Sequence, residues 1–464
     1  MITFLSNPLK NKQGLLLFVD SIILIFVFII SYSFRVVLYE GGHISLIRER
    51  FTWLVGIAIF LHLISFYIFE LYDLETRRSN GKILFLIILS VVVASGMIAI
   101  LSYLIPKSKL GRVILTIHAP LTIFTIFIWR KLFFVYFQEK AGNNLLLIGN
   151  SPLNKEILEL IENTPIKYYN LTGTIYNYKE NPGAIYINGS ISGKSIYDIV
   201  KEENIHTIVI SEQLKDTPVL RTQLLNLKFA GVSIYDAPVF YKKITGKVPV
   251  FFIRDTWFLF YNQDKAFQSF YWKNLKRIID IVSASLGLIL SAPLLLLSAV
   301  AIKLTSKGPI FFKQERLGLN ERPFTLIKFR TMVEDAEKET GPKWSSDKDP
   351  RITKVGRILR KTRIDEIPQL INVLRGDMSL VGPRPIRKHF ADILAKKIPF
   401  YRLRFLIKPG ITGWAQVKHD YAGSEKGQME KLQYDLFYIQ NQSLFFDIFI
   451  ILKTIQTVLF RRGE

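Results

Sequence analysis

The stretch IIDIVSASLGLILSAPLLLLSAVAI, residues 278–302, decides how this chain is arranged about a membrane. It is apolar and long enough to cross a bilayer, so a spanning helix is the simplest interpretation. Ser291 and Pro293 lie near its centre, however, and a proline removes a backbone hydrogen bond and bends a helix. We therefore predict a re-entrant helix at about 276–303, which enters one leaflet and returns at a helix break formed by Ser291 and Pro293.

Basic residues lie on both sides of this stretch, with Lys273, Lys276 and Arg277 before it and Lys303 and Lys307 after it. A re-entrant helix places all of these cations at one head-group surface, where their side chains reach anionic lipid. A spanning helix would instead place the last third of the chain across the membrane from the region that precedes it.

Four apolar runs fill the first third of the chain, and each is close to the roughly 20 residues that a helix needs to cross a bilayer core. The first run is too long for a removable signal peptide and lacks its small-residue cleavage site. The flanking charges decide the orientation poorly, but an even number of spans keeps both ends of this region on one side. We predict a four-span transmembrane bundle over 1–138, built from the runs 14–38, 51–72, 83–105 and 113–129.

Short apolar strands alternate with polar helices in the next part of the chain, which predicts an α/β domain over 139–265. Strand candidates begin at 143 and lie within HTIVISEQ (206–213) and GVSIYDAP (231–238). The turn after the first strand reads GNSPLN from Gly149, where a dinucleotide-binding loop needs G-x-G-x-x-G. Because two of the three glycines are missing, we interpret the domain as a degenerate Rossmann-like module for regulation or assembly, and a homodimer is an open option.

The composition favours anionic partners and a membrane anchor. The 464 residues carry a formal net charge of +23, and 49% of them are hydrophobic. This balance suits a protein that contacts inner-membrane lipids and phosphorylated substrates, and we expect no nucleic acid partner. The chain has no cysteine, which excludes disulfides, thiolate metal sites and cysteine nucleophiles.

Two adjacent carboxylates, Asp365 and Glu366, stand among cations in RKTRIDEIPQL, residues 360–370. One interpretation is a solvated helix end with local ion pairs. The other is a site where carboxylates attack or hold an anionic group. Consecutive residues on an α-helix point about 100° apart, so the two carboxylates are suited to divided roles rather than to one shared role.

Ordered motifs in the last third distinguish these interpretations. This part of the chain resembles the bacterial sugar transferase family, the monotopic phosphoglycosyl transferases, and the whole architecture resembles the large subgroup that starts exopolysaccharide or O-antigen synthesis. The resemblance implies a membrane α/β protein, with the four-helix bundle, the degenerate domain and an α/β catalytic domain over 270–464 anchored by the re-entrant helix. The motifs that carry it are GPIFFKQERLG (308–318), FTLIKFRTM (324–332), the Asp-Glu segment, GPRP (382–385) and KPGITGWAQV (408–417).

The resemblance implies transfer of a sugar-1-phosphate, for which we expect an unmodified hexose, from a UDP-sugar to undecaprenyl (polyprenyl) phosphate. The products are polyprenyl diphosphate-sugar and UMP. Asp365 is the implied nucleophile, which attacks the β-phosphate and carries a covalent phosphosugar, and Glu366 supports Mg²⁺ with Asp365 beside it. Nearby cations cancel the repulsion between two anions, and we expect them to keep Asp365 ionised.

Four basic residues are candidates for substrate binding. Arg360 and Arg384 match family arginines, and a planar guanidinium suits bidentate phosphate contacts. Lys328 and Arg330, in KFR, point the same way if that segment is a strand. For each of them the alternative is a surface cation beside acidic lipid. The chain departs from the family after GWAQV, where Lys418-His419-Asp420 replaces the usual Asn-Gly-Arg, and Lys418 is a candidate to compensate.

We expect a multi-pass protein of the bacterial inner (cytoplasmic) membrane, with its catalytic domain facing the cytosol. A catalytically inactive membrane scaffold or regulator of polysaccharide assembly is the alternative, although the intact Asp-Glu pair and GPRP motif count against it. A polytopic transporter is a third interpretation. The first four runs disfavour it, because they contain few charged or titratable residues besides Asp20, His62, Glu70 and His118.

Overall fold

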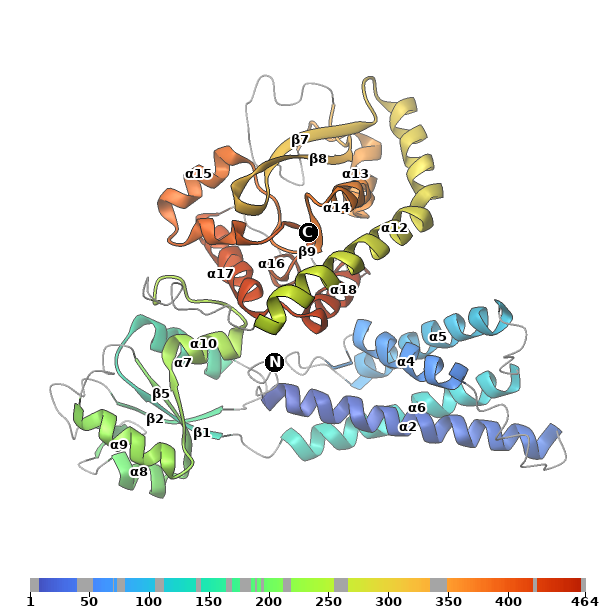
Figure 1. Cartoon of the computed structure of the whole chain (residues 1–464). Helices are drawn as coiled ribbons and strands as arrows, with labels where there is room; N and C mark the ends of the chain where they lie inside the picture. Colours follow the sequence, from blue (N-terminus) through green and yellow to red (C-terminus); the bar gives the residue numbers. More distant parts are fainter. Residues whose placement is uncertain are drawn as a thin grey trace. The chain divides into compact units, whose positions relative to one another are not determined.

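A computed structural model shows two compact units, Met1–Ile244 and Thr245–Glu464 (Figure 1). The first unit contains apolar helices and an α/β sheet, and the second combines helices with two short sheets. The structure describes residues 8–39, 53–69, 71–72, 80–104, 112–138, 143–163, 169–175, 185–187, 190–192, 196–211, 218–253, 266–333, 349–419 and 424–459.

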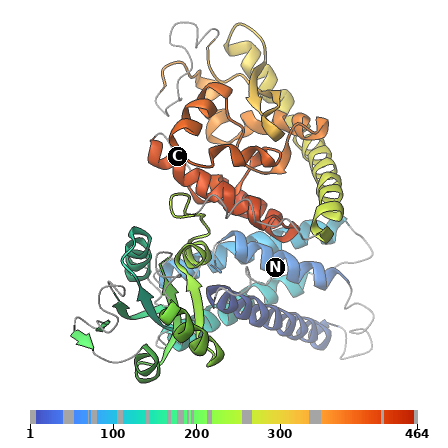
Figure 2. The same ribbon diagram turned by 60° about the vertical axis from the view of Figure 1, so that its left-hand side comes forward.

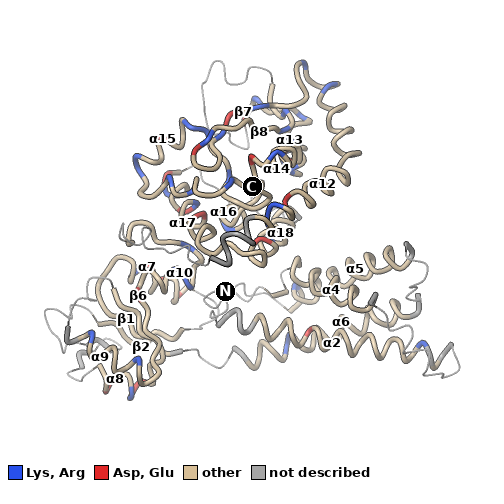
Figure 3. Tube along the Cα trace, viewed as in Figure 1, with Lys and Arg blue, Asp and Glu red and all other residues tan. Residues whose placement is uncertain are grey.

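The four predicted apolar helices at the N-terminus are confirmed. α2, α5 and α6 each contain a segment that is long and apolar enough to span a membrane. α4 is shorter, because its 16 residues extend about 24 Å, against about 30 Å for a bilayer core. Charged residues are almost absent from α4 and α5 (Figure 3). The helices are α2 (Pro8–Tyr39), α4 (Trp53–Ile68), α5 (Asn80–Leu104) and α6 (Arg112–Gln138).

Asp20 of α2 is neutralised by Arg130 of α6. The two side chains are almost completely buried and meet through two hydrogen bonds, Nη1 to Oδ1 at 3.1 Å and Nη2 to Oδ2 at 2.7 Å. The guanidinium also lies 5.3 Å from the ring centroid of Tyr72. Asp20 therefore forms a buried link between two helices, while Glu70 lies outside the described residues.

A mixed sheet with strand order β4-β3-β2-β1-β5-β6 forms the α/β part of the first unit. β2, β1, β5 and β6 are parallel, and β3 and β4 form an antiparallel edge. Leu146, Ile148 and Ile208 are buried against the helices. The elements are β1 (Asn143–Ile148), α7 (Pro152–Asn163), β2 (Tyr169–Ile175), β3 (Ile185–Ile187), β4 (Ser190–Ser192), α8 (Ile196–Glu202), β5 (Ile205–Ile210), α9 (Pro218–Phe229), β6 (Ser233–Asp236) and α10 (Ala237–Thr245).

Asn154 stands where the dinucleotide-binding loop would have its third glycine. Its buried amide nitrogen donates to the carbonyls of Ile148, at 3.2 Å, and Gly149, at 2.8 Å. Gly149 itself has φ 102°, a left-handed conformation that favours glycine. The side chain of Asn154 thus occupies the space under the turn where a glycine would allow close packing of helix on strand.

The second unit is the predicted mixed α/β domain. β7 and β8 form an antiparallel hairpin, and β9 and β10 pair in parallel. Its elements are α12 (Ala266–Thr305), β7 (Phe311–Leu317), η3 (Leu319–Glu321), β8 (Pro323–Phe329), α13 (Lys354–Lys361), η4 (Ile364–Gln369), α14 (Leu370–Arg375), β9 (Ser379–Val381), α15 (Lys388–Lys397), η5 (Tyr401–Leu406), β10 (Gly410–Thr412), α16 (Trp414–Lys418), α17 (Glu425–Asn441) and α18 (Leu444–Leu459).

α12 contains the stretch that was predicted to re-enter the membrane. It is one helix through Pro293, and its course bends (Figures 1 and 2). The Ser291 hydroxyl donates to the carbonyl of Gly287 at 2.6 Å, within the turn before the proline. Leu290, near the middle of the helix, is 81% exposed, as is Leu304 near its end. The segment Asn274–Thr305 is apolar and long enough to cross a membrane.

Both halves of α12 pack on later elements of the second unit. Ala284, before the proline, lies in a buried cluster with Val373 of α14. Ile302, after it, lies in another cluster with Phe329 and Leu359. A straight helix of 40 residues would extend about 60 Å, so the bend lets both halves contact one globular body.

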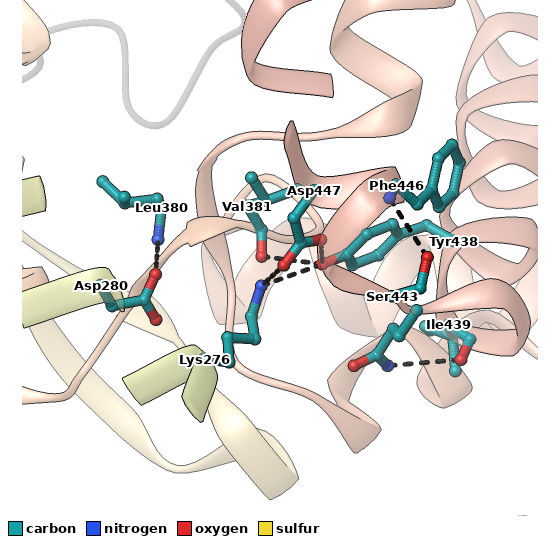
Figure 4. A network of polar contacts seen from close by, with 10 residues as sticks. Lys276, Asp280, Leu380, Val381, Tyr438, Ile439, Ser443, Phe446 and Asp447 are labelled. Atoms are coloured by element: carbon teal, nitrogen blue, oxygen red, sulfur yellow. Dashed lines mark hydrogen bonds and ion pairs between the residues drawn. The ribbon is translucent and has the colours of Figure 1, made fainter. Parts of the chain in front are cut away.

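The first turns of α12 are also held by polar contacts (Figure 4). Lys276 forms an ion pair with Asp447 of α18 and lies 3.2 Å from the Tyr438 hydroxyl of α17. That hydroxyl donates to Asp447 at 2.6 Å, and it lies 3.2 Å from the carbonyl oxygen of Val381 in β9. The network therefore joins α12, β9, α17 and α18 before the apolar part of α12 begins.

Candidate active site

The carboxylate pair lies in η4, a 3-10 helix that follows a sharp turn. Arg363 has φ 57°, and this left-handed residue ends α13 and redirects the chain. The strained conformation costs a non-glycine residue roughly 1–2 kcal/mol, which is typical of turns at functional sites. A 3-10 helix turns about 120° per residue, so Asp365 and Glu366 diverge even more than the predicted α-helix would allow.

Glu366 is held by arginines. Its Oε1 accepts a hydrogen bond from Nη2 of Arg384 at 2.5 Å, and Nη1 of Arg384 lies 3.4 Å from Oε2. Arg363 is a more distant partner, with Nη1 3.9 Å from Oε1. Burial disfavours the charged carboxylate, but Arg384, together with Arg363 and Lys328, outweighs this effect and holds the pKa of Glu366 well below its usual range. Glu366 in turn raises the pKa of Arg384.

Asp365 is 5% exposed, and its Oδ1 has no hydrogen-bond partner among the described residues. Burial raises the pKa of this carboxyl group, and the charge of Glu366 acts in the same direction. Lys328 and Arg360 act against the rise without cancelling it. The cations thus act in the expected direction, towards the ionised form, but burial and the adjacent carboxylate have the larger effect and leave the pKa of Asp365 raised to about 6, still below neutral pH.

Two of the four predicted substrate-binding cations lie about Asp365, and a third, Arg384, holds Glu366 as described above. Lys328 lies on β8 opposite Phe312 and interacts electrostatically with Asp365. Burial lowers the pKa of its ammonium group to about 8. Arg360, in the last turn of α13, donates from Nε to the Thr331 hydroxyl at 3.1 Å. The structure thus brings Lys328, Arg360 and Arg384 together around the carboxylate pair.

Arg330, the fourth cation, follows the end of β8 and is buried. Its Nη2 donates to the Ser306 carbonyl at 3.0 Å and to the Ser306 hydroxyl at 2.8 Å. Ser306 comes directly after α12. Arg330 therefore contacts the end of the apolar helix, whereas Lys328 interacts electrostatically with the two carboxylates.

Arg404 is a site residue that the sequence interpretation missed. From η5, its Nη2 donates to the backbone carbonyl of Arg384 at 3.0 Å and to Asp435 at 2.8 Å. Its Nη1 donates to the Tyr401 hydroxyl at 2.8 Å. Arg404 thereby holds the main chain of the GPRP loop at Arg384. No local sequence signal marks this role, because the contacted atom of Arg384 is a main-chain oxygen.

The segment that replaces Asn-Gly-Arg contacts other groups. The Lys418 ammonium lies 5.3 Å from the centroid of Trp414, and Nε2 of His419 lies 3.2 Å from Glu430. Asp420 lies outside the described residues. The described contacts of Lys418 and His419 are therefore with Trp414 and Glu430, and not with Asp365 or Glu366.

The carboxylate pair fits a Mg²⁺ ion whose coordination shell is completed by substrate and water. In the described part of the chain, no group of three or more His, Asp or Glu residues could hold a metal. Mg²⁺ commonly binds through one or two carboxylates, with water and substrate phosphates as the other ligands. The buried, unpartnered Oδ1 of Asp365, next to Glu366, matches that donor set.

Comparison with known proteins agrees with this architecture. A family model described as bacterial sugar transferase matches residues 271–461. The chain is 47% identical to UDP-N-acetylgalactosamine-undecaprenyl-phosphate N-acetylgalactosaminephosphotransferase of Aeromonas hydrophila over 185 residues, which cover 40% of this chain and 44% of that protein. It is 33% identical to UDP-glucose:undecaprenyl-phosphate glucose-1-phosphate transferase of Escherichia coli over 320 residues, 66% of each protein.

A shorter relative is covered more fully. The UDP-glucose:undecaprenyl-phosphate glucose-1-phosphate transferase of Caulobacter vibrioides is 47% identical over 188 residues, which are 40% of this chain and 69% of the relative. The shared region carries the carboxylate pair, the GPRP loop and the apolar helix described above. The chain therefore belongs to the bacterial sugar transferase family.

Proposed function

We propose that this protein transfers a hexose-1-phosphate from a UDP-sugar to undecaprenyl phosphate, as the first membrane step of exopolysaccharide or O-antigen synthesis. The observation that carries the proposal is Asp365, a buried carboxylate with an unpartnered Oδ1, beside a glutamate that is fixed by Arg384. The names of the relatives support the classes of donor and acceptor, and two of them are glucose-1-phosphate transferases.

The reaction consists of two displacements at the same phosphorus. An oxygen of Asp365 attacks the β-phosphorus of the UDP-sugar, and the bond from that phosphorus to the bridging oxygen breaks. UMP leaves with the electron pair, and the sugar phosphate becomes an acyl phosphate on Asp365. A phosphate oxygen of undecaprenyl phosphate then attacks this phosphorus, which restores the carboxylate and gives undecaprenyl diphosphate-sugar.

The surrounding charges suit this chemistry. Lys328, Arg360 and Arg384 reduce the repulsion between a carboxylate nucleophile and a diphosphate, and they stabilise charge on the departing UMP. Arg384 is anchored by Glu366, so its remaining N–H groups are preorganised for phosphate. Glu366 and Asp365 would hold Mg²⁺, which when bound supplies further positive charge at the diphosphate.

We also infer that α12 is a re-entrant helix in the bacterial inner membrane, with the active site at the cytosolic surface. Both halves of α12 pack on one unit, and the side chains near its middle are exposed and apolar. The parallel strands β2, β1, β5 and β6 suit a degenerate Rossmann-like module. Asn154 under its first turn favours a role in assembly, such as a homodimer, over dinucleotide binding.

The covalent step can be tested without a lipid acceptor. Purified full-length protein, incubated with Mg²⁺ and a panel of labelled UDP-sugars, should release UMP in a stoichiometric burst and retain the labelled phosphosugar. Asp365→Asn should lose both signals, and Asp392→Asn, at an exposed ion pair on α15, should retain them. If UMP forms only when undecaprenyl phosphate is present, and Asp365→Asn remains active, the covalent mechanism is wrong.

A further inference from the structure

We propose that Arg330 and Ser306 bind the phosphate group of a membrane lipid at the end of α12. This inference rests on the proposed function only in taking α12 to lie in the membrane. It assigns to Arg330 a ligand distinct from the UDP-sugar diphosphate that is proposed to react at Asp365.

The first argument is the position of the Arg330 side chain. Its backbone N–H donates to the carbonyl of Ile310 at 2.9 Å, which fixes the residue beside the segment that leaves α12. The residue is 6% exposed, and Nη2 donates to both oxygens of Ser306. The Ser306 hydroxyl also donates to the carbonyl of Ile302 at 3.1 Å, so one of its lone pairs is directed to Arg330.

The second argument is the incomplete pairing of a buried charge. Nε and Nη1 of Arg330 have no hydrogen-bond partner among the described residues, and none of the described carboxylates forms an ion pair with it. Buried guanidinium groups are normally paired, because an unpaired buried charge is strongly unfavourable. Ser306 offers a carbonyl and a hydroxyl, which carry only partial negative charge. Among the described residues this guanidinium therefore lacks an anion, and Nε and Nη1, which are buried and unpartnered, are the donors that an anion reaching the site would pair with.

The third argument is the location of this unpaired cation. The last turns of α12 expose Leu297, at 69%, and Leu304, at 81%, which suits contact with acyl or polyprenyl chains. Lys303 and Lys307 flank the helix end, where charged lipid head groups would lie. The prevalent anion at that depth is a lipid phosphate, and arginine binds phosphate oxygens well.

The site also adjoins the carboxylate pair through the chain. Thr331, next to Arg330, accepts a hydrogen bond from Arg360, whose charge acts on Asp365. A lipid phosphate bound at Arg330 would thus lie beside the cations that surround the proposed nucleophile. This neighbourhood suits the acceptor, undecaprenyl phosphate, and the same phosphate chemistry could come from an anionic phospholipid.

The test is a direct binding measurement that needs no turnover. Full-length protein in nanodiscs of neutral lipid is titrated with fluorescent polyprenyl phosphate, with the matching polyprenol, and with phosphatidylglycerol. Arg330→Gln should weaken binding of polyprenyl phosphate by about tenfold, the usual effect of losing a charge-assisted hydrogen bond. Arg357→Gln removes an exposed arginine of α13 and should leave the binding of all three ligands unchanged. Ser306→Ala, which keeps the guanidinium, should weaken binding by about threefold and covers the case in which Arg330→Gln does not fold.

The outcomes separate the possible sources of the phosphate. A loss confined to polyprenyl phosphate identifies an acceptor site, and an equal loss for phosphatidylglycerol identifies a general lipid-phosphate site. If both Arg330→Gln and Ser306→Ala bind every lipid as the wild type does, the inference is wrong and the partner of Arg330 is another protein group. Repeating the titration with Asp365→Asn, which cannot form the proposed intermediate, keeps this result independent of the transferase mechanism.

Discussion

Arg384 and Glu366 form an ion pair, with 2.5 Å between Nη2 and Oε1, that joins the GPRP loop to the turn carrying Asp365. The Glu366 side chain is largely buried, whereas the Arg384 side chain is 43% exposed. The buried partner therefore fixes the arginine while part of the guanidinium stays accessible. Such an arrangement preorganises a cation for a phosphate ligand without neutralising all of its donors.

The first prediction is that the rate of UMP release depends on the bidentate geometry of the Arg384 guanidinium as well as on its charge. Arg384→Ala should lower the rate of UMP release by about a hundredfold, as expected for loss of a preorganised donor to a developing anion. Arg384→Lys keeps the charge but loses the bidentate geometry, so it should recover only part of the rate. Arg375→Lys, at an exposed arginine of α14, is the matched control. Equal rates for Arg384→Lys and wild type would show that charge alone suffices.

The second prediction concerns Arg404 as a positioning residue. Arg404→Gln should destabilise the fold, because it leaves Asp435 buried without its cation. The double variant Arg404→Gln with Asp435→Asn should recover the melting temperature, since no unpaired charge remains. Its kcat should nevertheless stay about tenfold low, because the Arg384 carbonyl has lost a charged donor in both variants. Recovery of kcat together with stability would assign Arg404 a purely structural role.

The sequence predicted the parts of this site that are local. Asp365, Glu366 and Arg360 lie in one charged segment, and the family motif names all three as candidates, so their proximity in the structure depends mainly on the local chain. The partner of Glu366 was harder to predict, because Arg384 lies 18 residues away and reaches the carboxylate only after the chain has passed through α14 and β9. The raised pKa of Asp365 depends on burial, which the charge pattern of the segment does not reveal.

The fold was predictable wherever composition alone determines an element. Long apolar runs marked α2, α5, α6 and α12, and the alternation of strands and helices marked the mixed sheet. The course of α12 required more than composition, because both of its halves pack on residues that come later in the chain, such as Val373 and Leu359. Likewise, the two KFR cations were expected to point the same way if KFR is a strand, but β8 ends at Phe329, and Arg330, which follows it, contacts Ser306.

The third prediction concerns the buried pair of Asp20 and Arg130 in the apolar helices. Asp20→Leu alone should lower stability by about 3–5 kcal/mol, because it leaves an uncompensated guanidinium in a site that excludes water. Asp20→Leu combined with Arg130→Met should recover most of the loss, since an apolar pair of similar volume needs no partner. Thermal unfolding in one detergent, read as a double-mutant cycle, measures the coupling. Additive losses would show that the two residues do not stabilise each other.

The fourth prediction is a pH dependence that originates at Lys431 of α17. Burial lowers the pKa of Lys431 to about 8; Arg384 and Arg404 act in the same direction, and Asp435 acts against it. Between that value and the ordinary lysine pKa of 10.5, the unfolded chain binds a proton that the folded chain has lost. Stability contributed by this group therefore rises with pH across that window, and below it the folded state bears the cost of a buried charge.

Lys431→Met should remove that contribution. The melting temperature of the variant should rise less steeply than that of the wild type between about pH 8 and 10, and the variant should be relatively more stable below pH 8. Lys426→Met, at an exposed lysine five residues earlier on α17, should leave the slope unchanged and so corrects for the other groups that titrate in this range. Parallel curves for wild type and Lys431→Met would show that Lys431 keeps its ordinary pKa, which would place its ammonium group in contact with water rather than among the arginines.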